Sequence, residues 1–319
     1  MRLNLDAIPS QELLASERAL APFATGTPHN RLECCPTHMK DSWPFLFENA
    51  RDARRRAIMC LNHKVGSTTW KLALLRGTNH ASFHRLDRTP HGSASPASPG
   101  CEAATADRAV RRYMMVRNPY SRLLSGYLDK AVLQKDVKHS KKFWPRGFDP
   151  ADAGRRPVAG FASFVHLVTS QPADEPLNAH FSLLTTKCHW EGGYDYVLPV
   201  EQMEAWYPPL VRALGLVEAL SSGWNLTTRF WRGGRECFYA PRGRSCGWVR
   251  EGADTAAPGG AAHAPATFHA TNANEALDKY YTQALAAAVT RWARDDLAAF
   301  GYRAWDGVDG AGCARRSAR

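Results

Sequence analysis

Apolar runs alternate with amphipathic segments along most of the chain, and this alternation predicts strands that alternate with helices. Each predicted buried strand is a short run dominated by apolar residues, and these runs are 57–61, 112–116 and 194–200. The predicted helices share apolar residues at helical spacing: 10–20, 119–131, 161–169, 201–214 and 273–300. Gly301 is placed to end the last of these helices. Strands that alternate with helices indicate an α/β fold with three layers and a central parallel sheet.

The segments outside these elements divide the chain into three parts. We expect an irregular N-terminal extension at 1–54, a main domain at 55–303 and a disordered tail at 304–319. The predicted loop segments share breaks at proline and glycine: about 87–108, 137–159 and 221–270. The pattern of residues 80–86 predicts one further short strand.

The turn that follows the first predicted strand has the composition of an anion site. Lys64 and Gly66 lie in it, and a helical pattern begins directly afterwards. The amides of Gly66, Ser67 and Thr68 would lie at the positive end of that helix, with the charge of Lys64 beside them. The loop is not a Walker A sequence, because its lysine precedes the glycine. We therefore predict a site for a phosphate-bearing ligand, whose identity this variant loop leaves open.

A second strand, turn and helix unit follows the same plan. Asn118 can cap the helix and Pro119 can occupy its first position. The predicted core face of this helix consists of apolar residues: Tyr120, Leu123, Leu124, Tyr127 and Ala131. The predicted polar face consists of Arg122, Ser125 and Asp129. Arg117 at the strand end and Ser125 on the helix could hold a second phosphate, since ligands of open α/β sheets bind at the carboxyl ends of strands.

The charge of the chain favours an anionic partner. Lysine and arginine number 41 against 30 acidic residues, which gives a net charge of +11. This excess fits nucleotides, sulfated or uronic-acid glycans, or nucleic acid, although no nucleic-acid motif is present and that partner is not expected. A basic cluster precedes the first predicted strand and consists of Arg51, Arg54, Arg55 and Arg56. These side chains could face an anionic ligand, but we favour a position on a solvated helix face.

Eight cysteines are present without a metal-type Cys-x-x-Cys pair, and we expect no metal site. Cys237 and Cys246 flank a turn and predict a local disulfide. Asn225 begins a glycosylation sequon, which is weak support for a secretory compartment. Neither a signal peptide nor an apolar run long enough to cross a membrane is visible, so the chain is either cytosolic or lacks its natural N-terminus.

The two anion units resemble motifs of one known family. Residues 63–71 (HKVGSTTWK) are similar to the 5′-phosphosulfate loop of the Golgi carbohydrate sulfotransferases of the HNK-1, chondroitin and dermatan type. Residues 115–130 resemble that family's 3′-phosphate motif, including the step from Arg117 to Ser125. The resemblance covers about residues 55–302. Further matches follow in the family's order: Asn178, His180, Cys188, Tyr194, Tyr196, Glu201 and residues 296–302. The chain departs from the family at His63, where proline is usual, and at Phe181, where tryptophan is usual.

The resemblance implies a P-loop-like sulfotransferase fold. It also implies transfer of a sulfonate group to a sugar hydroxyl from the co-substrate 3′-phosphoadenylyl sulfate (PAPS). No metal is implied in this reaction. The implied donor-binding residues are His63, Lys64, Val65, Gly66, Ser67, Thr68, Thr69, Arg117 and Ser125. The implied catalytic residues are Lys64, which stabilises the leaving phosphate, and a base, for which His180 is the first candidate, His84 the second and Glu201 the third.

The resemblance also implies a Golgi location in the lumen or at the membrane, with membrane association only through an anchor that this chain does not contain. The expected partner is a glycan or another hydroxyl acceptor, an anionic one included, and not nucleic acid. Three alternatives stay open: a sulfotransferase for a small alcohol, phenol or protein, a non-enzymatic polyanion-binding protein, and, less favoured, a P-loop kinase.

Overall fold

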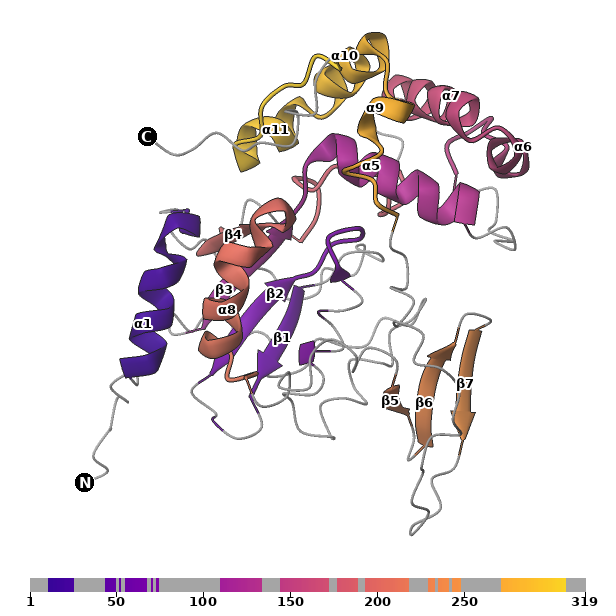
Figure 1. Cartoon of the computed structure of the whole chain (residues 1–319). Coiled ribbons are helices and arrows are strands. Elements are labelled where there is room, and N and C mark those ends of the chain that lie inside the picture. Colours follow the sequence, from indigo (N-terminus) through magenta and orange to yellow (C-terminus); the bar gives the residue numbers. More distant parts are fainter. Residues whose placement is uncertain are drawn as a thin grey trace, which may run out of the picture.

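A four-stranded sheet forms the centre of the computed structural model (Figure 1). Its strands lie in the order β1 (Pro44–Glu48), β2 (Arg56–Cys60), β3 (Arg111–Val116) and β4 (Tyr196–Pro199). The strands β2, β3 and β4 run parallel, and β1 pairs antiparallel with β2 at one edge. The carboxyl ends of the three parallel strands therefore meet at the same edge of the sheet.

The structure describes these residues: 11–25, 44–49, 52, 55–67, 70, 73–74, 110–133, 144–171, 177–188, 193–217, 229–232, 235–240, 243–247 and 271–307. The strand expected at 80–86 and the insertion expected at 87–108 lie outside the described residues.

Two apolar cores, one on each face of the sheet, confirm the expected three layers. Along β3, Met114 and Val116 belong to one core and Tyr113 and Met115 to the other, as strand alternation requires. The first core is covered by α5 (Pro119–Tyr127), α6 (Pro150–Arg155), α7 (Pro157–Ser170), α9 (Leu277–Tyr280), α10 (Gln283–Trp292) and α11 (Arg294–Phe300). The second core is covered by α1 (Gln11–Leu20) and α8 (Met203–Ala213), which follows a short 3₁₀ turn at Val200–Gln202.

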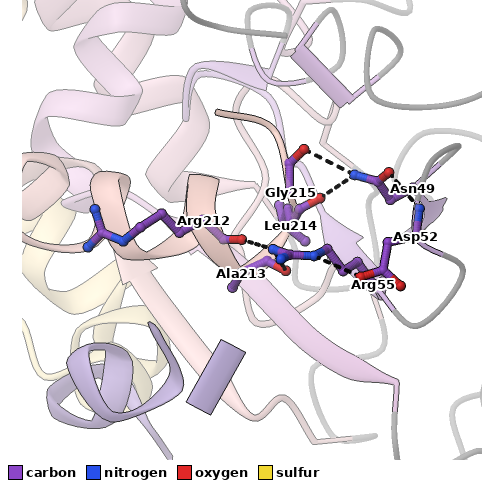
Figure 2. A network of polar contacts seen from close by, with 7 residues as sticks. All are labelled: Asn49, Asp52, Arg55, Arg212, Ala213, Leu214 and Gly215. Carbon is purple, nitrogen blue, oxygen red and sulfur yellow. Dashed lines mark hydrogen bonds and ion pairs between the residues drawn. The ribbon is translucent and has the colours of Figure 1, made fainter. Parts of the chain in front are cut away.

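The described part of the N-terminal extension contains regular structure, since α1 packs on α8 and β1 completes the sheet. Its polar residues also hold the end of α8 (Figure 2). Asn49 Nδ2 donates to the carbonyls of Leu214 and Gly215 at 2.8 and 3.1 Å. Arg55 donates to the carbonyls of Arg212 and Ala213 and pairs with Asp52. Arg55 thus donates to carbonyls at the C-terminal end of α8, where the helix dipole favours a cation, and does not lie on a solvated helix face.

The helix expected at 273–300 is three helices. Tyr281 has extended backbone (φ −93°, ψ 134°), and the side chain of Thr282 accepts a hydrogen bond from the amide of Leu285 to begin α10. A hydroxyl side chain that caps a new helix can end the previous one within an unbroken apolar pattern. Gly301 ends α11 in the left-handed conformation (φ 68°), as predicted.

Two of the predicted loop regions contain regular structure. The segment 137–159 includes α6 and the start of α7, and both helices begin with a proline at the first position. The segment 221–270 includes an antiparallel sheet of β5 (Arg229–Arg232), β6 (Arg235–Ala240) and β7 (Gly243–Gly247). In the predicted tail, Trp305 is buried and its amide donates to the hydroxyl of Tyr120 at 3.0 Å, so disorder is wrong for this residue. Residues 308–319 lie outside the described part.

In the part of the chain that the structure describes, no helix combines the length and apolar character needed to cross a membrane.

Candidate active site

The loop after β2 has a backbone that favours glycine at two positions. Lys64 has φ 67° and Gly66 has φ 79°, both in the left-handed region. The chain becomes helical at Ser67, and the amide of Trp70 donates to the carbonyl of Gly66 at 3.1 Å. Val65 is buried against the second core. The loop therefore turns sharply where the anion site was predicted, while Thr68 and Thr69 lie outside the described residues.

The ammonium group of Lys64 lies in a buried ion pair. Its Nζ is 3.1 Å from Oδ2 of Asp129, and the same oxygen is 3.0 Å from Nζ of Lys130. Burial lowers the pKa of Lys64 to about 8, Asp129 opposes that change, and Lys130 and Arg117 add to it. The sequence placed Asp129 on a polar face with Arg122 and Ser125, but all three side chains are buried. That face of the helix is therefore turned toward the protein interior rather than toward solvent.

Arg117 joins the two predicted anion units. Its Nη1 donates to the carbonyl of Lys64 at 3.2 Å, and its Nε donates to Oγ of Ser121 at 3.2 Å. Its Nη2 donates to Oδ1 of Asn274 at 2.8 Å. Arg117 is thus anchored between the loop after β2, the start of α5 and the C-terminal segment. The prediction that these units form one site is in accord with this geometry.

The helix that carries Ser125 begins as predicted. Asn118 caps it, with Oδ1 accepting from the amide of Tyr120 at 3.0 Å, and Pro119 occupies the first position. Ser125 lies two turns further on, where its hydroxyl accepts a hydrogen bond from Thr271 at 2.9 Å. Thr271 and Asn274 therefore contact the two residues predicted to hold the second phosphate. Sequence reasoning missed both, because no signal in the chain joins the segment before α9 to the helix α5.

His180 lies beside the lysine loop, with its ring centroid 4.0 Å from that of His63 and the two ring planes tilted by 32°. Oδ1 of Asn178 accepts from the backbone amide of His180 at 3.0 Å and lies 2.7 Å from Nδ1 of the ring. Since this atom accepts from a backbone N–H, it is an oxygen, and Nδ1 must carry the ring proton. Nε2 is then left with its lone pair, which is the form that a general base needs.

Several positive groups surround His180. Burial, followed by the charges of His63, Lys130 and Lys64, holds the pKa of the His180 imidazole well below its usual value of 6.5, with Asp129 acting in the opposite direction. The imidazole is therefore neutral at physiological pH. His63, at which the chain departs from the family it resembles, packs against His180 and contributes to the low pKa of its imidazole. His84, the second candidate base, lies outside the described residues.

Glu201, the third candidate base, has both carboxylate oxygens engaged. Oε1 accepts from the amide of Asn118 at 2.8 Å, and Oε2 accepts from the hydroxyl of Tyr302 at 2.8 Å. These contacts hold the turn after β3 against the C-terminal segment. Glu201 therefore supports the site structurally.

A disulfide joins Cys60, at the end of β2, to Cys188, with 5.9 Å between the Cα atoms. It fixes the segment that carries His180 to the strand that leads into the lysine loop. The sequence did not predict this pairing, because the partners are 128 residues apart. The predicted partners Cys237 and Cys246 are directly opposite in the β6–β7 register, and their disulfide stays a prediction.

Replacing Cys60 and Cys188 together by serine is expected to lower the free energy of unfolding by about 2–5 kcal/mol, because the unfolded chain regains the entropy of a long loop. Chemical denaturation of the variant and the parent protein measures this difference. Activity should fall further than stability, since the His180 segment loses its covalent tie to β2. Equal stability of the two proteins under oxidising conditions would contradict the pairing.

Within the described residues, no group of three or more His, Cys, Asp or Glu side chains is arranged to hold a metal ion. The site instead contains Lys64 and Lys130 near the loop after β2, and Arg117 and Ser125 near the turn after β3. The neutral imidazole of His180 lies beside them. The cations and the hydroxyl can bind a ligand that carries two separated anionic groups. The imidazole can take a proton from a second substrate bound next to that ligand.

Comparison with known proteins gives one match. The model of a family described as the sulfotransferase family matches residues 50–221, which is more than half of the chain. No curated protein and no solved structure matches the chain. The matched segment spans the lysine loop, the turn after β3 and the segment of His180.

Proposed function

The chain belongs to the sulfotransferase family, and from this premise we propose that it is a carbohydrate O-sulfotransferase that uses PAPS as its donor. Transfer of a sulfonate group is the activity of the family, and PAPS is its typical donor. The resemblance of residues 63–71 and 115–130 to the Golgi carbohydrate enzymes supports the narrower assignment.

The observation that carries the proposal is the meeting of two anion loops at the carboxyl ends of β2 and β3. Arg117 reaches the carbonyl of Lys64, so the two loops share one site. PAPS carries a phosphosulfate at one end of its ribose and a phosphate at the 3′ position, and it therefore needs two anion subsites. We assign Lys64 and the rest of 63–69 to the phosphosulfate, and Arg117 with Ser125 to the 3′-phosphate.

The residues present can carry out each part of the transfer. Nε2 of His180 accepts the proton of the acceptor hydroxyl, whose oxygen forms the new bond to sulfur. The bond between sulfur and the bridging phosphate oxygen breaks, and adenosine 3′,5′-bisphosphate leaves. The ammonium group of Lys64 stabilises the negative charge that grows on that oxygen. The products are the sulfated acceptor, the bisphosphate and a proton held on His180.

The acceptor and the location are also part of this proposal. A net charge of +11 suits an anionic glycan acceptor. The buried disulfide between Cys60 and Cys188 supports an oxidising compartment such as the Golgi lumen. Transfer of labelled sulfate from PAPS to a panel of desulfated glycans, simple phenols and tyrosine peptides tests the acceptor class. Labelling of only phenols or peptides would replace the carbohydrate assignment with the corresponding alternative.

Adenosine 3′,5′-bisphosphate is expected to raise the melting temperature of the protein, because a ligand that binds only the folded state stabilises it, by about 2.7 kcal/mol at 100 times Kd. Arg117→Ala and Ser125→Ala should each weaken this shift. Differential scanning fluorimetry across a range of ligand concentrations measures both effects. Adenosine 5′-monophosphate, which lacks the 3′-phosphate, is the matched control ligand and should bind the parent protein and these variants similarly. Absence of any shift at millimolar bisphosphate would rule out the donor assignment.

A further inference from the structure

One carboxylate oxygen lies between the two lysines of the site. Oδ2 of Asp129 is 3.1 Å from Nζ of Lys64 and 3.0 Å from Nζ of Lys130. The carboxylate is almost fully buried, with 3 % of its side chain exposed, and the side chain of Lys64 is 8 % exposed. An ion pair this far from solvent is weakly screened, so its effect on the charge of Lys64 is large.

A change in helix type precedes Asp129. The helix α5 ends at Tyr127, and Leu128–Leu133 forms a π-helical segment. Successive side chains of a regular α-helix diverge by about 100°, yet Asp129 and Lys130 meet at one oxygen atom. Wider turns of this kind occur often at functional sites. Here the π-helical segment carries both charged residues of the pair that faces the lysine loop.

We propose that Asp129 is a positioning residue that keeps Lys64 protonated and fixes its ammonium group for sulfonate transfer. The inference rests on the proposed function, because it assigns Asp129 a task only if Lys64 acts on the donor. The backbone of Lys64 is already held by Arg117 at its carbonyl. Asp129 holds the other end of the residue, so the lysine is fixed both at its backbone and at its charged tip.

The charges around Lys64 explain why this carboxylate is needed. Of the groups that face Lys64 in the described part of the chain, Asp129 is negative, while Lys130 and Arg117 are positive. His180, which packs on His63 beside the loop, also senses the charge of Lys64. Burial and the neighbouring cations all favour loss of the lysine proton. With Asp129 removed, Lys64 would be a neutral amine over much of the physiological pH range and a poor partner for an anion.

The pKa of Lys64 can be measured without donor or acceptor. Trace acylation by acetic anhydride at a series of pH values, followed by mass spectrometry of the peptide that contains Lys64, gives the pH at which half of the amine is deprotonated. Asp129→Asn keeps the size of the side chain and removes its charge. It is expected to lower that pH by one unit or more, since a close opposite charge shifts a pKa by about 1–3 units.

Two further variants give the experiment its controls. Lys130→Met removes a neighbouring positive charge and should raise the pH at which half of the Lys64 amine is deprotonated, which we call the midpoint of Lys64. This shift is opposite in sign to the one expected for Asp129→Asn. Glu17→Gln removes the carboxylate of a separate ion pair, in which Oε1 of Glu17 lies 2.6 Å from Nε of Arg111 at the start of β3. It should leave the midpoint unchanged. If Asp129→Asn does not fold, the double variant Asp129→Asn/Lys130→Met, which leaves no second lysine without its carboxylate, tests the coupling, because its Lys64 midpoint should lie below that of Lys130→Met.

The outcomes separate this inference from the proposed function. A downward shift in Asp129→Asn with an upward shift in Lys130→Met supports the inference, and the alkaline limb of the kcat profile should move with the midpoint. Asp129→Glu should recover most of the parent profile, because it restores the charge. An unchanged midpoint in both variants overturns the inference even if the parent protein transfers sulfonate. The expected shifts in a protein that transfers no sulfonate would overturn the proposed function and leave the control of Lys64 by Asp129 intact.

Discussion

Replacement of Lys64 by alanine is expected to lower kcat for sulfonate transfer by about 10²–10³-fold, the loss seen when one preorganised donor to a developing oxyanion is removed. The ammonium group is buried and held at 3.1 Å from Asp129, so solvent cannot take its place. Binding of the bisphosphate product should weaken less than kcat, because Arg117 and Ser125 remain. Steady-state kinetics at saturating donor, with calorimetric binding of the product, measure the two effects separately.

The structure provides a control for this variant. Lys130 continues to pair with Asp129 when Lys64 is lost, so the carboxylate is not left alone in the interior. Melting curves should show that Lys64→Ala is folded. Lys64→Arg keeps the charge but changes the shape of the donor group, and an intermediate rate is expected. A turnover number for Lys64→Ala equal to that of the parent would remove the loop from the mechanism.

Replacement of His180 by alanine is expected to lower kcat by about 10²–10⁴-fold, the usual contribution of a general base. The pH profile of the parent enzyme follows from the two pKa values. His180 must be neutral, so activity is lost as pH falls through its depressed pKa, well below 6.5. Lys64 must be protonated, so activity is lost as pH rises through about 8. Kinetics from pH 5 to pH 9 should therefore show a plateau near neutrality, and His180→Ala should lose the acid limb.

His84→Ala is the matched comparison, since His84 is the competing candidate from the sequence. Both variants should be assayed at saturating PAPS so that donor binding does not limit the rate. If His84→Ala loses turnover and the acid limb while His180→Ala keeps them, the base is His84 and the role of His180 is structural.

The elements predicted from local patterns were mostly confirmed, whereas breaks inside a continuous apolar pattern and a strand that depends on pairing were missed. Apolar runs identified β2 and β3, and Asn118 with Pro119 identified the start of α5. The breaks around Tyr281 and Ala293 were missed because the apolar spacing continues across them. The edge strand β1 was missed because its role depends on pairing with β2, which a local pattern does not contain.

In the site, the sequence identified residues whose chemistry fits an anion, but not the residues that control them. Lys64, Arg117, Ser125 and His180 stand in recognisable motifs. Asp129 was assigned only to the polar face of its helix, and the packing of the loop after β2 against the π-helical segment reveals its partner. The contacts from Thr271 and Asn274 each span about 150 residues. Long-range pairing of this kind cannot be deduced from one chain without its fold.

The carboxylate of Glu201 has a consequence for truncated forms of the protein. It is bonded at the same time to the amide of Asn118 and to the hydroxyl of Tyr302. Glu201 itself bonds to the turn after β3, but Tyr302, which holds its other oxygen, lies 101 positions further along the chain. A chain that stops before residue 302 has both predicted anion loops in its sequence but lacks the hydroxyl that holds Glu201 against the turn after β3. Such a truncated chain should therefore bind adenosine 3′,5′-bisphosphate more weakly than the full chain.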